Sequence, residues 1–236
     1  MRRRSIPFFT IVLAFLLLGA ANDQATILSE DFKDLSRWRE VFFSKKPSHT
    51  KYTAVTEGGA TFLRAQSRAS ASLLVYKEIF NPYQYPRVRW SWKIDNIIPN
   101  ADLKTRAGDD LPIRVYIAFA YDPAKADFFE RIIYNTLKFI YGEYPPKNSL
   151  NYVWSSRVYP EKVIPSPYTK KNMMILLEQG SVKTGTWVKE EVNILEDYRR
   201  VFGEDPPSRA TIGIMSDTDN TEAEAVSYLT ALTVSR

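Results

Sequence analysis

The feature that most constrains the fold is a strict alternation of apolar and polar side chains between Pro86 and Asp95. The even positions are apolar and the odd positions polar: Val88, Trp90, Trp92 and Ile94 against Arg87, Arg89, Ser91, Lys93 and Asp95. Side chains of a β-strand point alternately to its two faces, so this segment predicts a strand with one buried and one solvated face. Both tryptophans share the apolar face, and we expect them in the core.

Similar alternation recurs along the chain after residue 25. Residues 113–121 put Arg114 and Tyr116 on a mixed second face, which is typical of a central strand that lines a groove. The other predicted strands are 26–32, 38–43, 51–56, 61–66, 72–79, 150–155, 172–178, 186–194, 210–215 and 225–234. About a dozen strands separated by turn signals predict an all-β fold, a jelly-roll (concanavalin-like) antiparallel β-sandwich.

Two segments break the alternation. Residues 124–141 carry apolar side chains at three- and four-residue spacing, which predicts one helical insertion. Residues 195–202, ended by Gly203, predict one short helix. No linker composition divides the chain, so residues 22–236 are expected to form a single β-sandwich domain.

The first 21 residues have the organisation of a secretory signal peptide. Three arginines (residues 2–4) precede a mostly apolar run up to Leu18 and the small residues Gly19, Ala20 and Ala21. This run is too short to span a bilayer as a helix, and no transmembrane segment is expected in the mature chain. We therefore expect cleavage near Ala21 and an exported protein, either periplasmic or extracellular.

Charge and composition exclude several classes of function. The full chain carries a formal charge of +5, of which the leader supplies three arginines, so the mature chain is close to neutral and no nucleic-acid partner is expected. The chain has no cysteine, which excludes disulfides, thiolate catalysis and Cys-ligated zinc. The chain has a single histidine, His49, so it cannot form a His-rich metal site. Nothing in the sequence identifies a partner protein.

Several stretches together resemble the bacterial family called domain of unknown function 3047 (DUF3047). The matching stretches are residues 67–72, 85–93, 107–116, 151–155, 196–204 and 217–221. The resemblance covers nearly all of the mature chain in order. It implies an exported bacterial protein with a lectin-like or carbohydrate-module-like sandwich, whose opening residues 30–32 pair with its closing segment 228–234. The resemblance assigns no functional residue.

One acidic loop has the composition of a calcium site. Its oxygen-bearing side chains include Asp217, Asp219, Asn220 and Glu222, directly after a predicted strand. Such side chains supply much of the oxygen shell that Ca²⁺ requires, although the loop lacks the spacing of an EF-hand. The alternative is a tight turn in which Asp and Asn bond their own backbone. The loop therefore predicts a structural Ca²⁺ ion in the first case and no bound cofactor in the second.

A second candidate site combines charged and aromatic side chains on the predicted sheet. If the strand of Arg89 and Lys93 neighbours the strand of Arg114 and Tyr116, their side chains share one face. Guanidinium groups bind carboxylates and aromatic rings stack on sugars, so this face suits an acidic glycan or another acidic polymer. The candidate ligand-binding residues are Arg89, Lys93, Asp109, Asp110, Arg114, Tyr116 and Trp154.

Three functions remain open on these grounds. A non-catalytic glycan-binding protein of the cell envelope fits export, the sandwich pattern and the aromatic content. A glycan hydrolase or lyase would need two carboxylates, or Tyr116 beside Arg114, in one cleft. An envelope structural or assembly protein is the third alternative. No catalytic residue is assigned.

Overall fold

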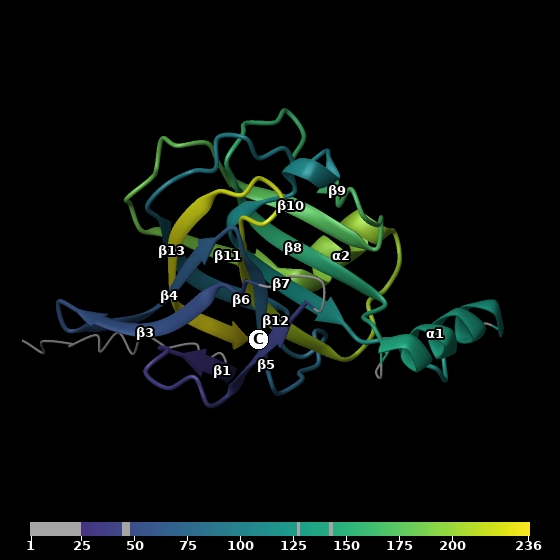
Figure 1. The fold of residues 1–236 in the computed structure, drawn as a ribbon. Helices are drawn as coiled ribbons and strands as arrows, with labels where there is room; N and C mark the ends of the chain where they lie inside the picture. Colours follow the sequence, from purple (N-terminus) through teal and green to yellow (C-terminus); the bar gives the residue numbers. More distant parts are fainter. Residues whose placement is uncertain (1–24, 44–47, 127, 142–143) are drawn as a thin grey trace, which may run out of the picture.

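Strand β6 (Arg87–Ile94), which contains the alternating segment, lies inside the first of two β-sheets that pack face to face (Figure 1). The computed structural model describes residues 25–43, 48–126, 128–141 and 144–236. The predicted leader, residues 1–21, lies outside the described residues. Within these ranges, no helix has the length and hydropathy that crossing a membrane would need.

We call the first sheet sheet A. Its strands are β1 (Thr26–Glu30), β3 (Lys51–Glu57), β4 (Ala60–Arg68), β6, β11 (Val188–Asn193) and β13 (Glu224–Ser235). They follow the order β11-β6-β13-β4-β3, with β1 also paired to β13. Glu30 of β1 lies opposite Leu232 of β13, which confirms the predicted pairing of the opening and closing segments.

The second sheet, sheet B, has the order β2-β5-β12-β7-β8-β10-β9. Its strands are β2 (Trp38–Phe42), β5 (Ala71–Tyr76), β7 (Leu111–Phe119), β8 (Asn148–Ser155), β9 (Val163–Pro165), β10 (Asn172–Gln179) and β12 (Ala210–Asp217). The fold is the predicted all-β jelly-roll sandwich. One pair, β8 with β10, is parallel, because edge strand β9 lies between them in the chain and runs antiparallel to β10.

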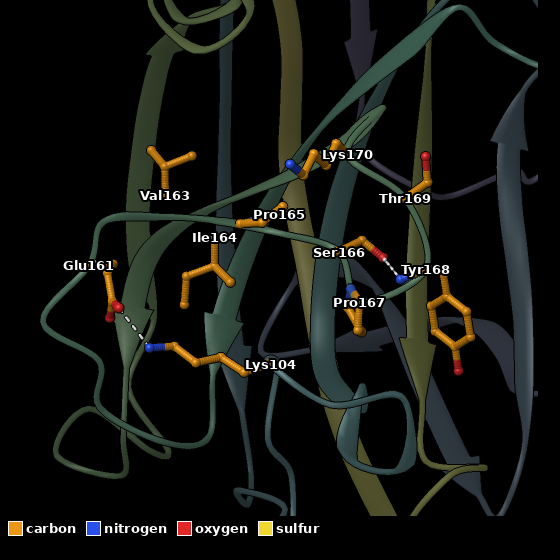
Figure 2. A pocket seen from close by; sticks show the side chains of 10 residues that line it. All are labelled: Lys104, Glu161, Val163, Ile164, Pro165, Ser166, Pro167, Tyr168, Thr169 and Lys170. Carbon is orange, nitrogen blue, oxygen red and sulfur yellow. Dashed lines mark hydrogen bonds and ion pairs between the residues drawn. The ribbon is translucent and has the colours of Figure 1, made fainter.

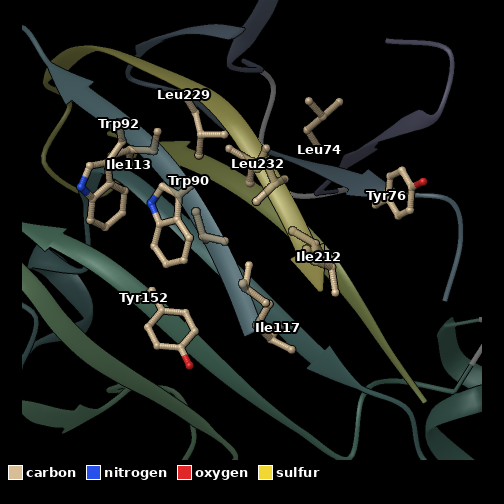
Figure 3. Close-up of a cluster of buried hydrophobic side chains, with 14 of the residues drawn as sticks. Leu74, Tyr76, Trp90, Trp92, Ile113, Ile117, Tyr152, Ile212, Leu229 and Leu232 are labelled. Carbon is tan, nitrogen blue, oxygen red and sulfur yellow. The ribbon is translucent and has the colours of Figure 1, made fainter. Parts of the chain in front are cut away.

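Aromatic and aliphatic side chains fill the space between the two sheets (Figure 3). Trp90 and Trp92 are 2% and 0% exposed, so the alternation of β6 correctly predicts its buried face. The ring of Trp90 lies 5.7 Å from that of Tyr152, and the ring of Trp92 lies 5.9 Å from that of Trp154. These contacts join β6 of sheet A to β8 of sheet B.

The same alternation leads to a correction. Strand β6 pairs with β11 and β13, whereas β7 pairs with β12 and β8 in the other sheet. Arg89 and Lys93 therefore do not share a face with Arg114 and Tyr116. Since both strands turn their apolar faces toward the common core, their polar faces lie on opposite outer sides of the sandwich.

Both predicted helices are present. Helix α2 (Ile194–Phe202) begins at Asn193, whose side chain accepts the backbone N–H groups of Leu195 and Glu196, and ends at Gly203 with a φ of 71°. Helix α1 (Phe128–Tyr141) extends away from the sandwich (Figure 1). Tyr134 anchors α1, because its ring stacks on Tyr121 at 3.8 Å. A short 3-10 helix, η1 (Arg106–Gly108), precedes β7.

The core position of Trp154 gives a first prediction. Trp154→Ala should lower the free energy of unfolding by about 3–5 kcal/mol, because it leaves a cavity between the sheets. Trp187→Ala is the matched control, since Trp187 is 39% exposed, and we expect it to cost about 1 kcal/mol. Urea unfolding followed by circular dichroism measures both. Equal losses in the two variants would contradict this arrangement of the core.

Candidate functional site

A cluster of aromatic and cationic side chains lies on the outer face of sheet A. We call it the aromatic face and define it by Phe62, Lys93, Trp187, Lys189 and Tyr228. Strands β4, β6, β11 and β13 are neighbours in the sheet, and Trp187 directly precedes β11. In the register of these strands, Tyr228 lies opposite Lys93 and Lys189 lies opposite Ser91. The odd positions of β6 thus point to this face, as the sequence predicts.

The three aromatic rings of this face pack against one another. Phe62 is 5.6 Å from Trp187 and 5.5 Å from Tyr228, both in edge-to-face geometry. Phe62 is buried beneath the other two rings, whereas Trp187 is 39% exposed. The other four tryptophans of the chain are buried. A sugar ring therefore has one accessible indole to stack on, at a place where packing restricts its movement.

A hollow of about 520 Å³ adjoins these rings. Its lining comprises Glu57, Ala60, Phe62, Ser91, Lys93, Trp187, Lys189 and Thr230. The ammonium group of Lys93 lies 4.3 Å from the centre of the Tyr228 ring and 5.7 Å from that of Trp187. Such cation–π contacts fix the ammonium beside the hollow and leave its N–H groups able to bind a ligand oxygen.

The charges on this face are unevenly compensated. Glu191 binds Arg89 at 2.9 Å and Arg87 at 3.1 Å, so one carboxylate holds two guanidinium groups. Asp95 accepts a hydrogen bond from the Tyr228 hydroxyl at 2.7 Å and lies 3.9 Å from the Lys93 ammonium. Lys189 is exposed and forms no ion pair within the described part of the chain. With Glu57 also in the lining of the hollow, four cations face three carboxylates, which leaves one excess positive charge beside the exposed indole.

The structure divides the predicted ligand-binding residues among three places. Arg89 and Lys93 lie on the outer face of sheet A. Trp154, expected to stack on a sugar, is instead fully buried against Trp92, and its indole N–H donates to the carbonyl of Gly180. The prediction for Trp154 is wrong because Asn151 and Val153, not Tyr152 and Trp154, point away from the core. The remaining residues surround a buried acidic cluster on the other side of the sandwich.

The acidic cluster consists of Asp109, Asp110, Asp217 and Asp219. Carboxylate oxygens of Asp110, Asp217 and Asp219 all lie within 4.8 Å of one another. Arg114 donates from Nε to Asp217 Oδ1 at 3.0 Å and from Nη2 to Asp217 Oδ2, and its Nη1 lies 3.8 Å from Asp109 Oδ1. Asp109, Asp110, Asp217 and Arg114 are each at most 5% exposed. The structure thus gathers several acids around one guanidinium, out of contact with water.

Burial dominates the electrostatics of this cluster. It raises the pKa of Asp217 well above the usual range, although the Arg114 guanidinium opposes the shift. The pKa of Asp109 is raised for the same reason, and the charges of Asp110 and Asp219 raise it further. A buried carboxylate with a raised pKa is costly to ionise, and the Arg114 guanidinium bound to Asp217 offsets part of that cost.

Two residues of the predicted calcium loop, Asn220 and Glu222, do not belong to the group of converging carboxylates. Asn220 donates from its backbone and side-chain nitrogens to Asp110 Oδ1, at 3.1 and 3.2 Å. Glu222 is exposed and lies outside the group of converging carboxylates. Asp110, which directly precedes β7, contacts this loop instead. Its carboxylate also accepts hydrogen bonds from the backbone and hydroxyl of Thr221.

Tyr116 lies beside Arg114, as a lyase would require, with the guanidinium carbon 5.8 Å from its ring centre. Burial, however, raises the pKa of Tyr116 to about 12. A catalytic tyrosine base needs a pKa lowered toward the working pH, so the shift has the wrong direction for that role. The guanidinium of Arg114 is also already bound to Asp217.

A second hollow, of about 480 Å³, lies among the loops around β9 (Figure 2). Its walls include Val163, Ile164, two prolines and the half-exposed ring of Tyr168. Lys104 closes one side through an ion pair with Glu161 at 2.6 Å. Tyr168 is tied to η1, because its hydroxyl donates to the carbonyl of Arg106 at 3.2 Å. Of the residues that line this pocket, Tyr168 alone is aromatic.

Sequence reasoning missed Trp187 and Tyr228 on the aromatic face. Tyr228 belongs to the predicted strand 225–234, where it precedes the apolar Leu229. The alternation of that strand could therefore have predicted that the Tyr228 side chain points outward. Trp187 follows Gly185 at the end of a turn, where Gly185 donates its N–H to the carbonyl of Ile94. This contact between distant segments positions Trp187 against the rings of β4 and β13. The sequence around Trp187 alone does not predict such a contact.

Glu190 is a further residue that the sequence did not indicate. It points inward from β11, and its carboxylate accepts the indole N–H of Trp92 at 3.1 Å. Burial first, and the charge of Glu178 second, raise its pKa to about 7, while Lys183 opposes this shift. Because the folded pKa exceeds the unfolded value, ionising Glu190 weakens folding as the pH rises from about 4.5 through 7.

Glu190→Gln should therefore stabilise the protein relative to wild type at pH 8 but not at pH 5. We expect a gain of about 1 kcal/mol at pH 8, since solvent screens a partly exposed group. Glu191→Gln is the control: its partner Arg89 lowers the pKa of Glu191, so its effect should not change between pH 5 and 8. Urea unfolding at both pH values decides, and an effect of Glu190→Gln that is independent of pH would contradict the assignment.

Comparison with known proteins gives a family and distant structural relatives. A family model described as "Protein of unknown function (DUF3047)" matches residues 36–233. A search of curated proteins returned no match.

Among solved structures, a family 11 carbohydrate-binding module of a Clostridium thermocellum cellulase is 9% identical with a TM-score of 0.43, over 89% of this chain and 93% of that one. An adhesin domain of Lys-gingipain from Porphyromonas gingivalis is 9% identical with a TM-score of 0.40, over 88% and 96%. A Bauhinia forficata lectin is 10% identical with a TM-score of 0.38, over 88% and 97%.

Proposed function

The chain belongs to the family described as "Protein of unknown function (DUF3047)", and we propose that it is a non-catalytic glycan-binding protein of the cell envelope. The observation that carries this proposal is the aromatic face. An exposed indole, two lysines and a hollow of about 520 Å³ lie together on one side of a rigid sheet. Apolar ring faces and a few fixed polar groups are what a pyranose ring needs for stacking and orientation.

The charges of this face favour an acidic saccharide. Lys93 is held beside the hollow by two aromatic rings, and Lys189 is exposed on the neighbouring strand. Both ammonium groups can bind a sugar carboxylate through charge-assisted hydrogen bonds. Arg89, by contrast, is already paired with Glu191, so we assign it to holding the strands rather than to the ligand.

Export is part of the proposal. A mature chain that starts near Asn22 would meet glycans in the periplasm or outside the cell, where the absence of cysteine leaves folding independent of redox conditions. The cleavage site follows Ala21 in this interpretation. Mass spectrometry of the mature protein tests it directly.

Binding to a panel of acidic and neutral oligosaccharides tests the proposed function. We expect an acidic oligomer such as oligogalacturonate to bind, and Trp187→Ala to weaken binding at least about tenfold through loss of stacking. Lys189→Gln should weaken binding of the acidic oligomer severalfold but leave binding of its carboxyl-reduced form unchanged. Isothermal titration calorimetry gives the affinities. Because Trp187 is the exposed tryptophan, acrylamide quenching of fluorescence reports whether the ligand covers it.

Tyr168→Ala is the matched control, because Tyr168 is an exposed aromatic residue at the other hollow. We expect it to bind glycan as wild type does. If no member of the panel binds to the folded protein, the glycan-binding proposal fails. If Tyr168→Ala abolishes binding while Trp187→Ala does not, the site is at the loops around β9 and the aromatic face is not the binding surface.

A further inference from the structure

Building on the proposed function, we infer that Glu57 makes the hollow at the aromatic face selective for glycans that combine uronate units with uncharged sugar units. The hollow is lined by two lysines on one side of sheet A and by the Glu57 carboxylate on the other. A chain made of uronates alone places a carboxylate against Glu57. A mixed chain can place its acidic unit at the lysines and an uncharged unit at Glu57.

The hollow extends across sheet A. Its lining residues come from β3, β4, β6, β11 and β13, together with Trp187, which directly precedes β11. In the strand order β11-β6-β13-β4-β3, Lys189 lies on one edge strand and Glu57 on the other. Neighbouring strands are about 4.8 Å apart, so the path from β11 to β3 covers about 19 Å along the sheet. A hollow of this extent contacts more than one sugar unit of a bound chain.

The cationic end of the hollow is set by the register of three strands. Lys189 of β11 lies opposite Ser91 of β6, and Ser91 lies opposite Thr230 of β13. Lys93 follows Ser91 by two positions in β6 and therefore points to the same face of the sheet. Both ammonium groups thus belong to the side of the hollow formed by β11 and β6, where a sugar carboxylate is expected to bind.

The anionic end lies at the hairpin between β3 and β4. Glu57 is the last residue of β3 and pairs with Ala60, the first residue of β4. The two residues between them, Gly58 and Gly59, have φ values of 59° and 80°, which a tight two-residue hairpin turn requires. Glu57 is exposed and forms no ion pair within the residues that the structure describes. Its charge is therefore available to a ligand.

Distance keeps the two ends electrostatically separate. Exposed charges further apart than the Debye length, about 8 Å at physiological ionic strength, are largely screened from one another. Lys189, on the opposite edge strand, therefore does not neutralise Glu57. A uronate at the β3 end meets a like charge, which opposes binding. The hydroxyl groups of an uncharged sugar can instead donate hydrogen bonds to the Glu57 carboxylate.

Oligogalacturonate in three forms tests this inference: fully acidic, half methyl-esterified and fully methyl-esterified. The three forms share their sugar rings and linkages and differ in charge. We expect wild type to bind the half-esterified form about three- to fivefold more tightly than the fully acidic form, because repulsion by Glu57 is avoided. The fully esterified form should bind most weakly, since it offers Lys93 and Lys189 no carboxylate. Isothermal titration calorimetry at constant ionic strength gives the affinities.

Glu57→Gln should strengthen binding of the fully acidic form about three- to fivefold and so remove the preference for the half-esterified form. The substitution keeps the size of an exposed side chain, and circular dichroism checks that the variant is folded. Equal affinity of wild type for the fully acidic and half-esterified forms would overturn the inference. So would a preference that persists in Glu57→Gln.

The double variant Glu57→Gln/Lys189→Gln tests whether the two ends act separately. Because the two residues are far apart on the sheet, the changes in binding free energy for the fully acidic form should add. If Glu57→Gln has no effect once Lys189 is replaced, Glu57 acts only by neutralising the lysine, and its role in selecting the sugar is wrong.

Glu222→Gln is the matched control, since Glu222 is an exposed glutamate that does not line the hollow. We expect it to keep the wild-type preference. If it removes the preference as Glu57→Gln does, net charge and not Glu57 is responsible, and the inference fails. If no form of oligogalacturonate binds, the inference also fails, and the remaining oligosaccharides of the panel decide whether the protein binds glycans. If glycans bind without the expected preference, the glycan-binding proposal stands and the role of Glu57 alone is refuted.

Discussion

The contact between the inward rings of β6 and β8 is the interaction on which the rest of the structure depends. Trp90 meets Tyr152 and Trp92 meets Trp154 across the space between the sheets, and all four side chains are buried. Because each strand alternates, placing these rings inward also determines which side chains face out. The outward positions of β6 and β11 then carry Lys93 and Lys189, and those of β7 carry Arg114. One packing constraint thus positions both the aromatic face and the acidic cluster, on opposite sides of the sandwich.

Local patterns predicted most of the strands and both α-helices, but not β9, and not which strands are neighbours. The alternation of β6 predicted its buried face. The predicted helix 195–202 agrees within one residue with α2, whose ends are capped by Asn193 and Gly203. Which strand lies beside β6 depends on contacts between residues that are far apart in sequence. Lys189 opposite Ser91 is one such contact, and it cannot be read from either segment alone. For that reason the predicted union of Arg89 and Lys93 with Arg114 and Tyr116 is wrong, although each strand by itself is correct.

The same contrast between local patterns and long-range contacts applies to the candidate site residues. Asp217 and Asp219 are separated by one residue, so the loop composition predicted that they lie close together. Asp110 joins them from a segment more than one hundred residues earlier. Trp154 shows a different limit, since Tyr152 and Trp154 alternate with Asn151 and Val153, and neither face of β8 is polar enough to identify the solvated side. All eight residues of β8 except Ser149 are buried, because loops cover its outer face too. A strand that is buried on both sides gives no alternation to read.

Burial also separates the roles of the two charged regions. On sheet A the lysines stay in contact with water, so their charge costs little to maintain and remains available to a ligand that arrives from solution. In the acidic cluster the carboxylates are removed from water, and their mutual repulsion is not screened. An exposed cationic face can therefore be selected for recognition without loss of stability, whereas a buried anionic cluster persists only if something inside the fold compensates it. In the cluster that compensation comes from Arg114, which binds Asp217, and this difference is why we propose recognition at the aromatic face and not at the cluster.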